Sequence, residues 1–547
     1  MYDKGRAGNQ LGPCAYREGT YTHSENAFLA VNIKMETDVL IVGSGIAGLS
    51  TALYLAELQP DLFITILDKS PTEESNTRYA QGGMAAVFAL ETDSFEAHME
   101  DTLAAGKNHS DPSAVKKVVW GAPGTIGDLE RWGVEFDRAP DGRYDLGLEG
   151  GHAYHRIVHH KDTTGNEIHL KLLKKARQHT YIRRITQTMG EDLLITEREG
   201  IRHCYGVRVF DETAQESYTI TAKVVVLATG GSGQLFLQTT NPEVATGDGL
   251  AMAIRAGAAV RDLQYIQFHP TAIYDDSAKR NLLISEALRG AGAYILNRQL
   301  QRFLLRETPR GELATRDVVS SLMLAEMKKT GTPYLFLDAR HLGKNKLSKN
   351  FPQVFNNCKM RGYDLRKDLV PIVPAAHYQC GGIRVDHQGK STVEYLYAVG
   401  ECAATGLHGT NRLASNSLTE AMVFAKEIAC DIVRNLNRSD KEAPEIKTDG
   451  PVSIDKTPVG DGEWTDQTLR KLKTLMTELF VNPENESFRS GKYHHWITSC
   501  QNEVSGLIAR GSVSVETLEL HNLLTVGEAL SKAIQEENVK HYKNIHI

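Results

Sequence analysis

The chain has few cysteines for its length, and none of them occurs in a spacing that is typical of metal binding. The seven residues are Cys14, Cys204, Cys358, Cys380, Cys402, Cys430 and Cys500. They are scattered and odd in number, and no pair forms C-x-x-C, which argues against structural zinc, iron–sulfur ligands and a disulfide framework. We therefore expect no metal centre and a reducing, cytoplasmic location.

Long apolar runs and an excess of basic charge are also missing. No apolar run reaches the roughly 18 residues that span a bilayer. Residues 1–34 lack the apolar core and cleavage site of a secretory signal and are expected to be a polar extension or a mis-assigned start ahead of Met35. The 62 Lys and Arg are outnumbered by 68 Asp and Glu, and a net charge of −6 argues against a nucleic-acid surface. We expect neither a membrane span nor nucleic-acid binding.

A chain of 547 residues is too long for one hydrophobic core, so several structural units are expected. Strand–glycine–helix patterns occur early and return late, on either side of a loop-rich insertion, and the C-terminal end has helical periodicity. The predicted segments are an extension (1–34), a first domain (35–265), an insertion forming its own domain (266–385), the resumed first domain (386–436), a linker (437–464) and a helical domain (465–547).

The stretch "VGSGIAGLS" carries the clearest chemistry. Gly43, Gly45 and Gly48 form G-x-G-x-x-G between a buried strand and a helix, where backbone amides and the helix N-terminus can hold a pyrophosphate. Asp68 ends the next strand, 20 residues after Gly48 (68 − 48), where a carboxylate would reach a ribose hydroxyl. An ordinary structural glycine turn is the alternative, and this unit does not separate NAD from FAD.

Further segments favour FAD, because a long cofactor needs several glycine-bearing strand ends. "NTRYAQGGMAAV" (76–87) supplies amides and polar side chains, while "ATGG" and "AVGE" end two more strands, the second with Glu401. Each segment alone could be a plain turn between a strand and a helix.

Together these motifs resemble the succinate dehydrogenase/fumarate reductase flavoprotein family, and within it the branch that oxidises L-aspartate. The stretches, in family order, are "VGSGIAGLS", "YAQGGMAAVF", "EGGHAYHRI", "VVVLATGG", "QFHPTAIY", "SEALRGAGA", "RGELATRDVVS", "PAAHYQCGGIRVD" and "LYAVGECAATGLHGTNRLASNSL". The resemblance implies an α/β plus α fold: a Rossmann-like FAD-binding domain interrupted by an α+β capping domain, then a helical domain.

The resemblance also implies a cofactor site for FAD. Asn76 stands where many relatives carry the histidine that links FAD covalently, so noncovalent FAD is expected. The expected FAD-binding residues are Gly43, Ser44, Gly45, Ala47, Gly48, Asp68, Lys69, Asn76, Thr77, Ala80, Gln81, Gly82, Gly83, Ala228, Thr229, Gly230, Asp248, Glu401, Asn416, Ser417 and Leu418.

For the substrate, the resemblance implies four cations and a hydroxyl–carboxylate pair. His269 and His377 would hydrogen-bond carboxylates, Arg412 would bind one bidentately, and Arg316 matches the arginine assigned proton transfer in fumarate reduction. Arginine hardly deprotonates, so charge stabilisation is the role we prefer for it. Ser285 and Glu286 align with the family's hydroxyl–carboxylate pair, although Glu286 and Arg289 could simply pair on a helix.

Glu149, in "LGLEGGHAYHRIVH", is the feature that favours an amino acid over a plain dicarboxylate. It matches the family position that accepts the substrate ammonium or its proton; the alternative is a solvated loop charge. We expect flavin-dependent oxidation of L-aspartate to iminoaspartate, with oxygen or fumarate as acceptor, in quinolinate and NAD synthesis. Quinolinate synthase would be the partner that consumes the product.

Two other functions remain open at this stage, and some positions depart from the family pattern. A soluble fumarate reductase or succinate dehydrogenase flavoprotein is the enzymatic alternative, and an inactive flavin-binding relic is the other. Thr315 replaces the usual proline before Arg316, and the C-terminal "EENVKHYKNIHI" lacks the family's arginine motif. These departures put the contribution of the helical domain in question.

Overall fold

The computed structural model describes residues 34–343, 347–348, 351–436, 462–481 and 492–545. The predicted extension therefore lies outside the described residues except for Lys34, which already belongs to the first strand. Most of the predicted linker also lies outside them, and helix α12 begins at Gly462, inside its last residues.

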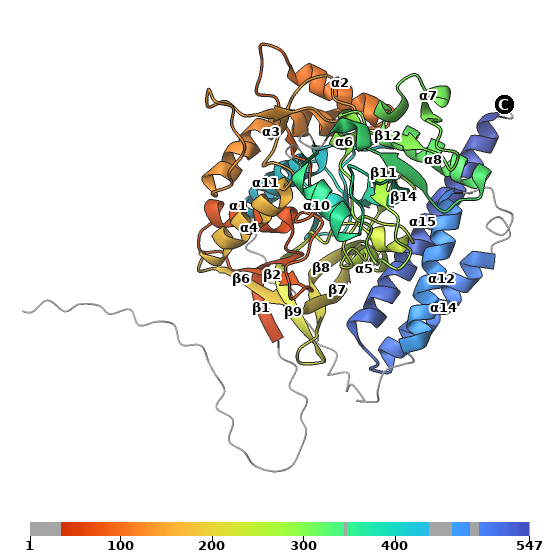
Figure 1. Ribbon diagram of the computed structural model, residues 1–547. Helices are drawn as coiled ribbons and strands as arrows, with labels where there is room; N and C mark the ends of the chain where they lie inside the picture. The colour runs from red at the N-terminus through yellow and green to blue at the C-terminus, as the bar shows by residue number, and fades with distance from the viewer. Residues whose placement is uncertain (1–33, 344–346, 349–350, 437–461, 482–491, 546–547) are drawn as a thin grey trace, which may run out of the picture.

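A seven-stranded sheet forms the centre of the molecule (Figure 1). Its order is β6-β2-β1-β9-β8-β7, with β16 also paired to β9. Strands β6, β2, β1, β9 and β16 run parallel, whereas β8 and β7 are antiparallel additions at one edge. The bounds are β1 Lys34–Val42, β2 Ile64–Asp68, β6 Ile182–Thr186, β7 Thr188–Arg198, β8 Ile201–Asp211, β9 Glu216–Leu227 and β16 Leu396–Ala398.

Helices cover both faces of this sheet, which explains why β1 ends in the continuous apolar run Val39, Leu40, Ile41 and Val42. Val39 and Ile41 of β1 face one hydrophobic cluster, and Leu40 and Val42 face another, as the alternation of a strand requires. The first cluster is covered by α1 Ile46–Leu58, α2 Phe95–Ala105, α3 Pro112–Arg131, α4 Thr164–Arg177 and α11 Asn416–Leu436.

The C-terminal helices complete the second cluster. They are α12 Gly462–Val481, α14 Lys492–Ala509 and α15 Val515–Ile545, drawn in blue at the right of Figure 1. Their apolar residues, such as Leu472 and Leu524, belong to the same cluster as Leu40 of β1 and the helix α5 Asp248–Arg255. The C-terminal region is helical, as predicted, but it shares a core with the sheet.

Residues 266–379 form a second, antiparallel sheet with the order β11-β14-β13-β12. Its elements are β11 Ile266–Ile273, α6 Glu286–Gly290, β12 Tyr294–Leu296, α7 Leu304–Glu307, α8 Arg316–Thr330, β13 Leu335–Asp338, α10 Pro352–Met360 and β14 Val370–Gln379. A hydrophobic cluster of its own runs from Ile273 to Ile372. The insertion thus has a separate core, as a folded unit needs.

Two small sheets connect these parts. One pairs β3 Met84–Ala85, β5 Ile157–Val158 and β4 Leu146–Gly147; the other pairs β10 Val260–Arg261, β15 Gly382–Arg384 and β17 Ala403–Ala404. The loop that carries Glu149 begins directly after β4. In the described part of the chain, none of the helices is both long and apolar enough to cross a membrane.

Candidate active site

A cavity of about 1810 Å³, its open mouth included, lies between the central sheet and the second sheet. Its walls come from the carboxyl ends of β1, β2, β9 and β16, where open α/β sheets bind ligands, and from β11, α6, α8 and β14 on the other side. All the predicted cofactor and substrate residues line it except Gly48 and Asn416.

The glycine loop after β1 forms one end of the cavity. Gly43 has a φ of +112°, and a Cβ there would collide with the carbonyl of Ala228. A Cβ on Gly48 would collide with the carbonyl of Gly43, so this glycine serves the close packing of α1 on the turn. Gly45 and Ile46 turn the N-terminus of α1 toward the cavity, which suits an anionic phosphate group.

The residues after β2 fit a large polar cofactor. Asn76 Oδ1 and Gln81 Oε1 are buried, line the cavity and have no hydrogen-bond partner within the described residues. Buried polar atoms of this kind are costly unless a ligand or water satisfies them. Thr77 Oγ1 accepts from the Ile46 amide at 3.0 Å and ties this segment to α1. The donor set and the glycine cradle therefore fit a flavin dinucleotide.

Asn76 and Glu401 meet across the cavity wall. Asn76 Nδ2 donates to Glu401 Oε2 at 2.9 Å, and the amide of Gln379 donates to Glu401 Oε1 at 3.0 Å. Burial raises the pKa of Glu401 to about 7. An asparagine amide cannot form the carbon–nitrogen bond that a histidine makes to a flavin.

Two predicted cofactor residues have their side chains committed elsewhere. Asn416 is fully buried beneath the cavity wall, where Oδ1 is 3.0 Å from His98 Nε2 and Nδ2 donates to Thr102 Oγ1 at 3.0 Å. Asp68 lines the cavity, but Arg184 donates to it at 2.6 Å and the hydroxyl of Ser44 donates to the same oxygen. Sequence patterns place such residues near the cofactor but do not say where their polar atoms point.

His269 and His377 stand side by side on the second sheet, with ring centroids 5.2 Å apart. A register shift between β11 and β14 follows His269, where Pro270 cannot donate to the ladder, and it sets the ring against the cavity. His269 Nδ1 faces the Thr271 amide at 3.3 Å, and His377 Nδ1 lies 2.8 Å from Thr240 Oγ1. Burial and the neighbouring arginines hold the pKa of both rings well below 6.5. Both are therefore neutral, and His269 keeps Nε2–H for donation.

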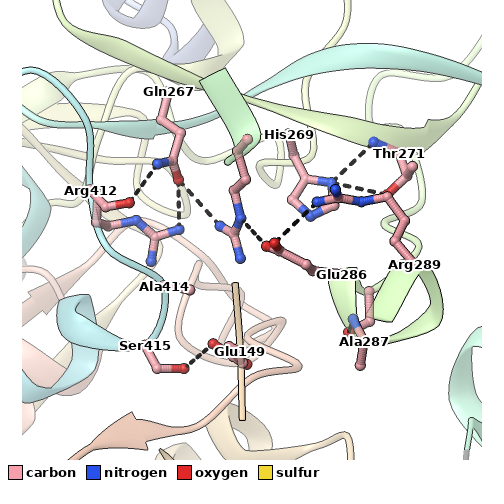
Figure 2. A network of polar contacts seen from close by, with 12 residues as sticks. Glu149, Gln267, His269, Thr271, Glu286, Ala287, Arg289, Arg412, Ala414 and Ser415 are labelled. Carbon is pink, nitrogen blue, oxygen red and sulfur yellow. Dashed lines mark hydrogen bonds and ion pairs between the residues drawn. The ribbon is translucent and has the colours of Figure 1, made fainter. Parts of the chain in front are cut away.

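An arginine–carboxylate chain runs along the same wall. Arg316 Nε donates to Glu286 Oε2 at 2.7 Å, and Arg289 Nη2 lies 3.2 Å from Glu286 Oε1. Although burial alone would raise the pKa of Glu286, these arginines outweigh it and lower the pKa. Ser285 caps α6 and faces the cavity. The resemblance alone assigned Arg289 no role, yet it completes this chain (Figure 2).

Arg412 has only uncharged partners within the described residues. It donates to Ser417 Oγ at 2.5 Å and to Gln267 Oε1 at 3.0 Å, and its guanidinium lies 4.5 Å above the Tyr378 ring. Its Nε has no partner, and it forms no ion pair within the described residues. Burial and the charge of Arg316 lower the pKa of Arg412 to about 10. A buried, unpaired cation is prepared for an anionic ligand.

Glu149 lies on the opposite side of this network from Glu286 and His269 (Figure 2). Its Oε2 accepts from Ser415 Oγ at 2.6 Å, and it has no ion-pair partner in the described part of the chain. Burial raises the pKa of Glu149 despite the Ser415 hydrogen bond and Arg316. One carboxylate therefore faces a group of cations and neutral donors across the cavity.

The sequence analysis missed Gln267, Ser415, Tyr378 and Arg280, which also line or adjoin the cavity. Gln267 could have been found, because it lies two residues before His269 and so on the same face of β11. Its Oε1 accepts from both Arg316, at 3.2 Å, and Arg412. Ser415 is 266 positions from Glu149, and no local pattern joins them.

Comparisons with known proteins agree with this geometry. A protein family described as FAD binding domain matches residues 38–418. L-aspartate oxidase of Yersinia pestis is 39% identical over 519 residues, covering 93% of this chain and 95% of that protein. The chloroplastic L-aspartate oxidase of Oryza sativa subsp. japonica is 37% identical, covering 91% and 79%. Among solved structures, the FrdA chain of E. coli quinol fumarate reductase has a TM-score of 0.78 at 29% identity, covering 91% and 89%.

Proposed function

Because this chain belongs to the L-aspartate oxidase family of FAD-binding flavoproteins, we propose that it oxidises L-aspartate to iminoaspartate. Dioxygen or fumarate would be the final electron acceptor. The observation that carries the proposal is the placement of Glu149, a half-buried carboxylate without an ion-pair partner among the described residues, in the same cavity as Arg316 and Arg412. Aspartate has two carboxylates and one ammonium, and this arrangement complements both kinds of charge.

The two carboxylates of the substrate meet the cationic wall. Arg412 offers Nε and its outer face to one carboxylate, while neutral His269 and His377 donate hydrogen bonds without needing protonation. Ser285 adds a hydroxyl donor at the same wall. Fumarate has the same two carboxylates, so it can enter this wall as the electron acceptor.

The ammonium meets Glu149. The Ser415 hydroxyl holds one carboxylate oxygen, which leaves the other free to accept from the ammonium and to take its proton as the imine forms. The raised pKa of Glu149 brings it closer to neutral pH, where proton acceptance and release are both possible. Succinate or fumarate would have no use for this group.

FAD, when bound, supplies the hydride acceptor for the α-carbon of aspartate. The glycine loop, Asn76 and Gln81 would hold it, and Asn76 leaves it noncovalently bound. The Arg316 guanidinium donates to Glu286 and stabilises negative charge at the reacting carbons. Glu286 and Arg289 keep it oriented.

We also propose the domain division and cellular role that follow. Residues 35–265 and 386–436 form the FAD-binding domain, residues 266–385 cap it, and residues 465–547 are the helical domain. Iminoaspartate is unstable in water, so quinolinate synthase is the partner we propose to consume it, in NAD synthesis. The unpaired cysteines among the described residues suit the reducing cytoplasm.

The test is the formation of hydrogen peroxide by the purified, FAD-loaded protein. Peroxide should form with L-aspartate and not with succinate, and the flavin should leave on denaturation. Succinate turnover with a dye acceptor, in the absence of peroxide from aspartate, would instead support a succinate dehydrogenase activity. A loaded flavin with neither activity would support the inactive flavin-binding protein.

A further inference from the structure

Helix α15, near the C-terminus, reaches the wall of the cofactor cavity through two polar side chains. Glu519 Oε1 accepts from Lys69 Nζ at 2.7 Å, and Asn522 Nδ2 donates to Asp248 Oδ1 at 3.0 Å. Lys69 follows β2 and Asp248 begins α5, and both line the cavity. Residues about 270 to 450 positions apart in the chain therefore meet at one point of the site.

These contacts form a closed network rather than a chance surface pair. The Lys69 ammonium has three donors, and it meets Thr246 Oγ1 at 2.6 Å, Asp248 Oδ2 at 2.8 Å and Glu519 Oε1 at 2.7 Å. Asp248 Oδ1 also accepts from Thr246 Oγ1 at 2.7 Å. Helix α15 thus supplies the third partner of the lysine, Glu519, and a second donor to Asp248 Oδ1, Asn522.

Asn522 fastens the same helix to the sheet. It is 2% exposed, and its Oδ1 accepts from Arg255 Nη1 at 2.9 Å. Arg255 in turn donates to Asp192 at 2.6 Å and to the carbonyl of Glu191 at 2.8 Å. Apolar packing alone would hold α15 on the sheet without burying an asparagine, so these polar groups have a more specific purpose.

The network stands where the nucleotide end of a dinucleotide lies, at the carboxyl end of β2. Asp68, the neighbouring residue, already accepts from Arg184 and Ser44. The Lys69–Asp248 pair adds a second charged group to this end of the cavity. A displacement of Lys69 or Asp248 would change both the shape of the cavity and the electrostatic potential around a bound nucleotide.

We propose that α15 is part of the cofactor site, with Glu519 and Asn522 as positioning residues that hold the Lys69–Asp248 pair and thereby set the affinity for FAD. The inference rests on FAD being the cofactor, as in the proposed function. It assigns the divergent C-terminal region a part in flavin retention.

The experiment measures FAD binding to the full chain after the flavin has been removed, by titration with FAD and quenching of flavin fluorescence. Glu519→Gln and Asn522→Asp should each raise the Kd for FAD by on the order of tenfold, as expected when residues coupled to a site are disturbed. Asn522→Asp keeps the size of the side chain and the Arg255 contact but places a carboxylate against Asp248. At saturating FAD, kcat should be unchanged.

Glu528→Gln is the matched control, because Glu528 lies on the same helix and pairs with Lys532 at 2.7 Å, outside the cavity lining. Its Kd should equal that of the unmodified protein. In a Lys69→Met background, Glu519→Gln should cause no further loss, because the group through which it acts is gone.

Three results would overturn the inference: Kd values for Glu519→Gln and Asn522→Asp that match the control, a Glu519→Gln effect undiminished in the Lys69→Met background, or a fall in kcat at saturating FAD. The titration reads FAD binding directly. A protein that binds FAD but does not oxidise aspartate would overturn the proposed function and leave this test intact.

Discussion

Two buried arginines, Arg156 and Arg412, have opposite surroundings. Arg156 is fully buried and donates to both oxygens of Asp93, at 2.9 and 2.7 Å, and to Asp101 at 2.6 Å. Arg412 is also buried, yet among the described residues its side chain meets only hydroxyl and amide oxygens and an aromatic ring. The first network is closed within the protein, whereas the second is complete only with an anionic ligand.

The presence or absence of a carboxylate partner distinguishes an arginine that stabilises the fold from one that binds a ligand. A buried ion pair that loses one partner leaves an uncompensated charge, which costs several kcal/mol. A buried cation without a counter-ion already carries that cost in the free protein, and a ligand carboxylate relieves it on binding. The same residue type thus serves the fold at one position and binds the substrate at the other.

The largest effect is expected from Arg156→Met. Asp93 and Asp101 would lose their cation inside the protein, and the free energy of unfolding should fall by about 3–5 kcal/mol. Urea unfolding followed by circular dichroism measures this. Arg143→Met is the control: Arg143 is 73% exposed in its ion pairs, so its loss should leave the free energy of unfolding nearly unchanged. Equal stability of the two variants would contradict the closed network.

Arg412→Leu should reduce activity without reducing the stability of the protein. The kcat/KM for aspartate should fall by roughly a thousandfold, because the substrate carboxylate loses its charged donor. The stability of the substrate-free protein should stay equal or rise, since an unpaired buried charge has been removed. Arg412→Lys should recover only part of the activity, because lysine cannot bind a carboxylate bidentately. A large loss of stability would show that Arg412, like Arg156, mainly stabilises the fold.

Glu149→Gln tests the other side of the cavity. Aspartate oxidation should fall by about a hundredfold in kcat/KM, while fumarate reduction by the same preparation should be largely spared. The amide keeps the size of the side chain and can still accept from Ser415, but it cannot take a proton. Equal loss of both activities, or of neither, would return Glu149 to a structural or solvated role.

The pH profile should show the smallest effect. Because the Glu149 pKa is raised above its usual value near 4.5, kcat/KM for aspartate should fall as the pH drops through that pKa, and Glu149→Gln should remove this limb. His269 and His377 have a pKa well below 6.5 and should add no limb between about pH 6 and 8. A histidine limb near pH 6.5 that persists in Glu149→Gln would contradict neutral histidines.

Much of the fold could be predicted from local pattern. The apolar runs of β1 and β2, the glycine turn at Gly43 and helices expected at 95–106, 113–132 and 165–177 follow from periodicity and turn chemistry. The structure has these helices at Phe95–Ala105, Pro112–Arg131 and Thr164–Arg177. The antiparallel hairpin of β7 and β8 was not predicted, because its mixed residues do not distinguish an edge hairpin from loop. The shared core of the C-terminal helices was also beyond prediction, since periodicity shows an apolar face but not the surface it covers.

The sequence by itself determined the family, the cofactor and the set of chemical groups: glycines at the strand ends, the cations Arg316 and Arg412, and the carboxylate Glu149. The tertiary structure decided which of those groups are satisfied by the protein and which are left for ligands. In the folded chain, Asn416 contacts His98 and Lys69 pairs with Glu519. The Nε of Arg412 has no hydrogen-bond partner among the described residues. Hydrogen-bond satisfaction depends on partners hundreds of residues apart, and only the folded chain brings those partners together.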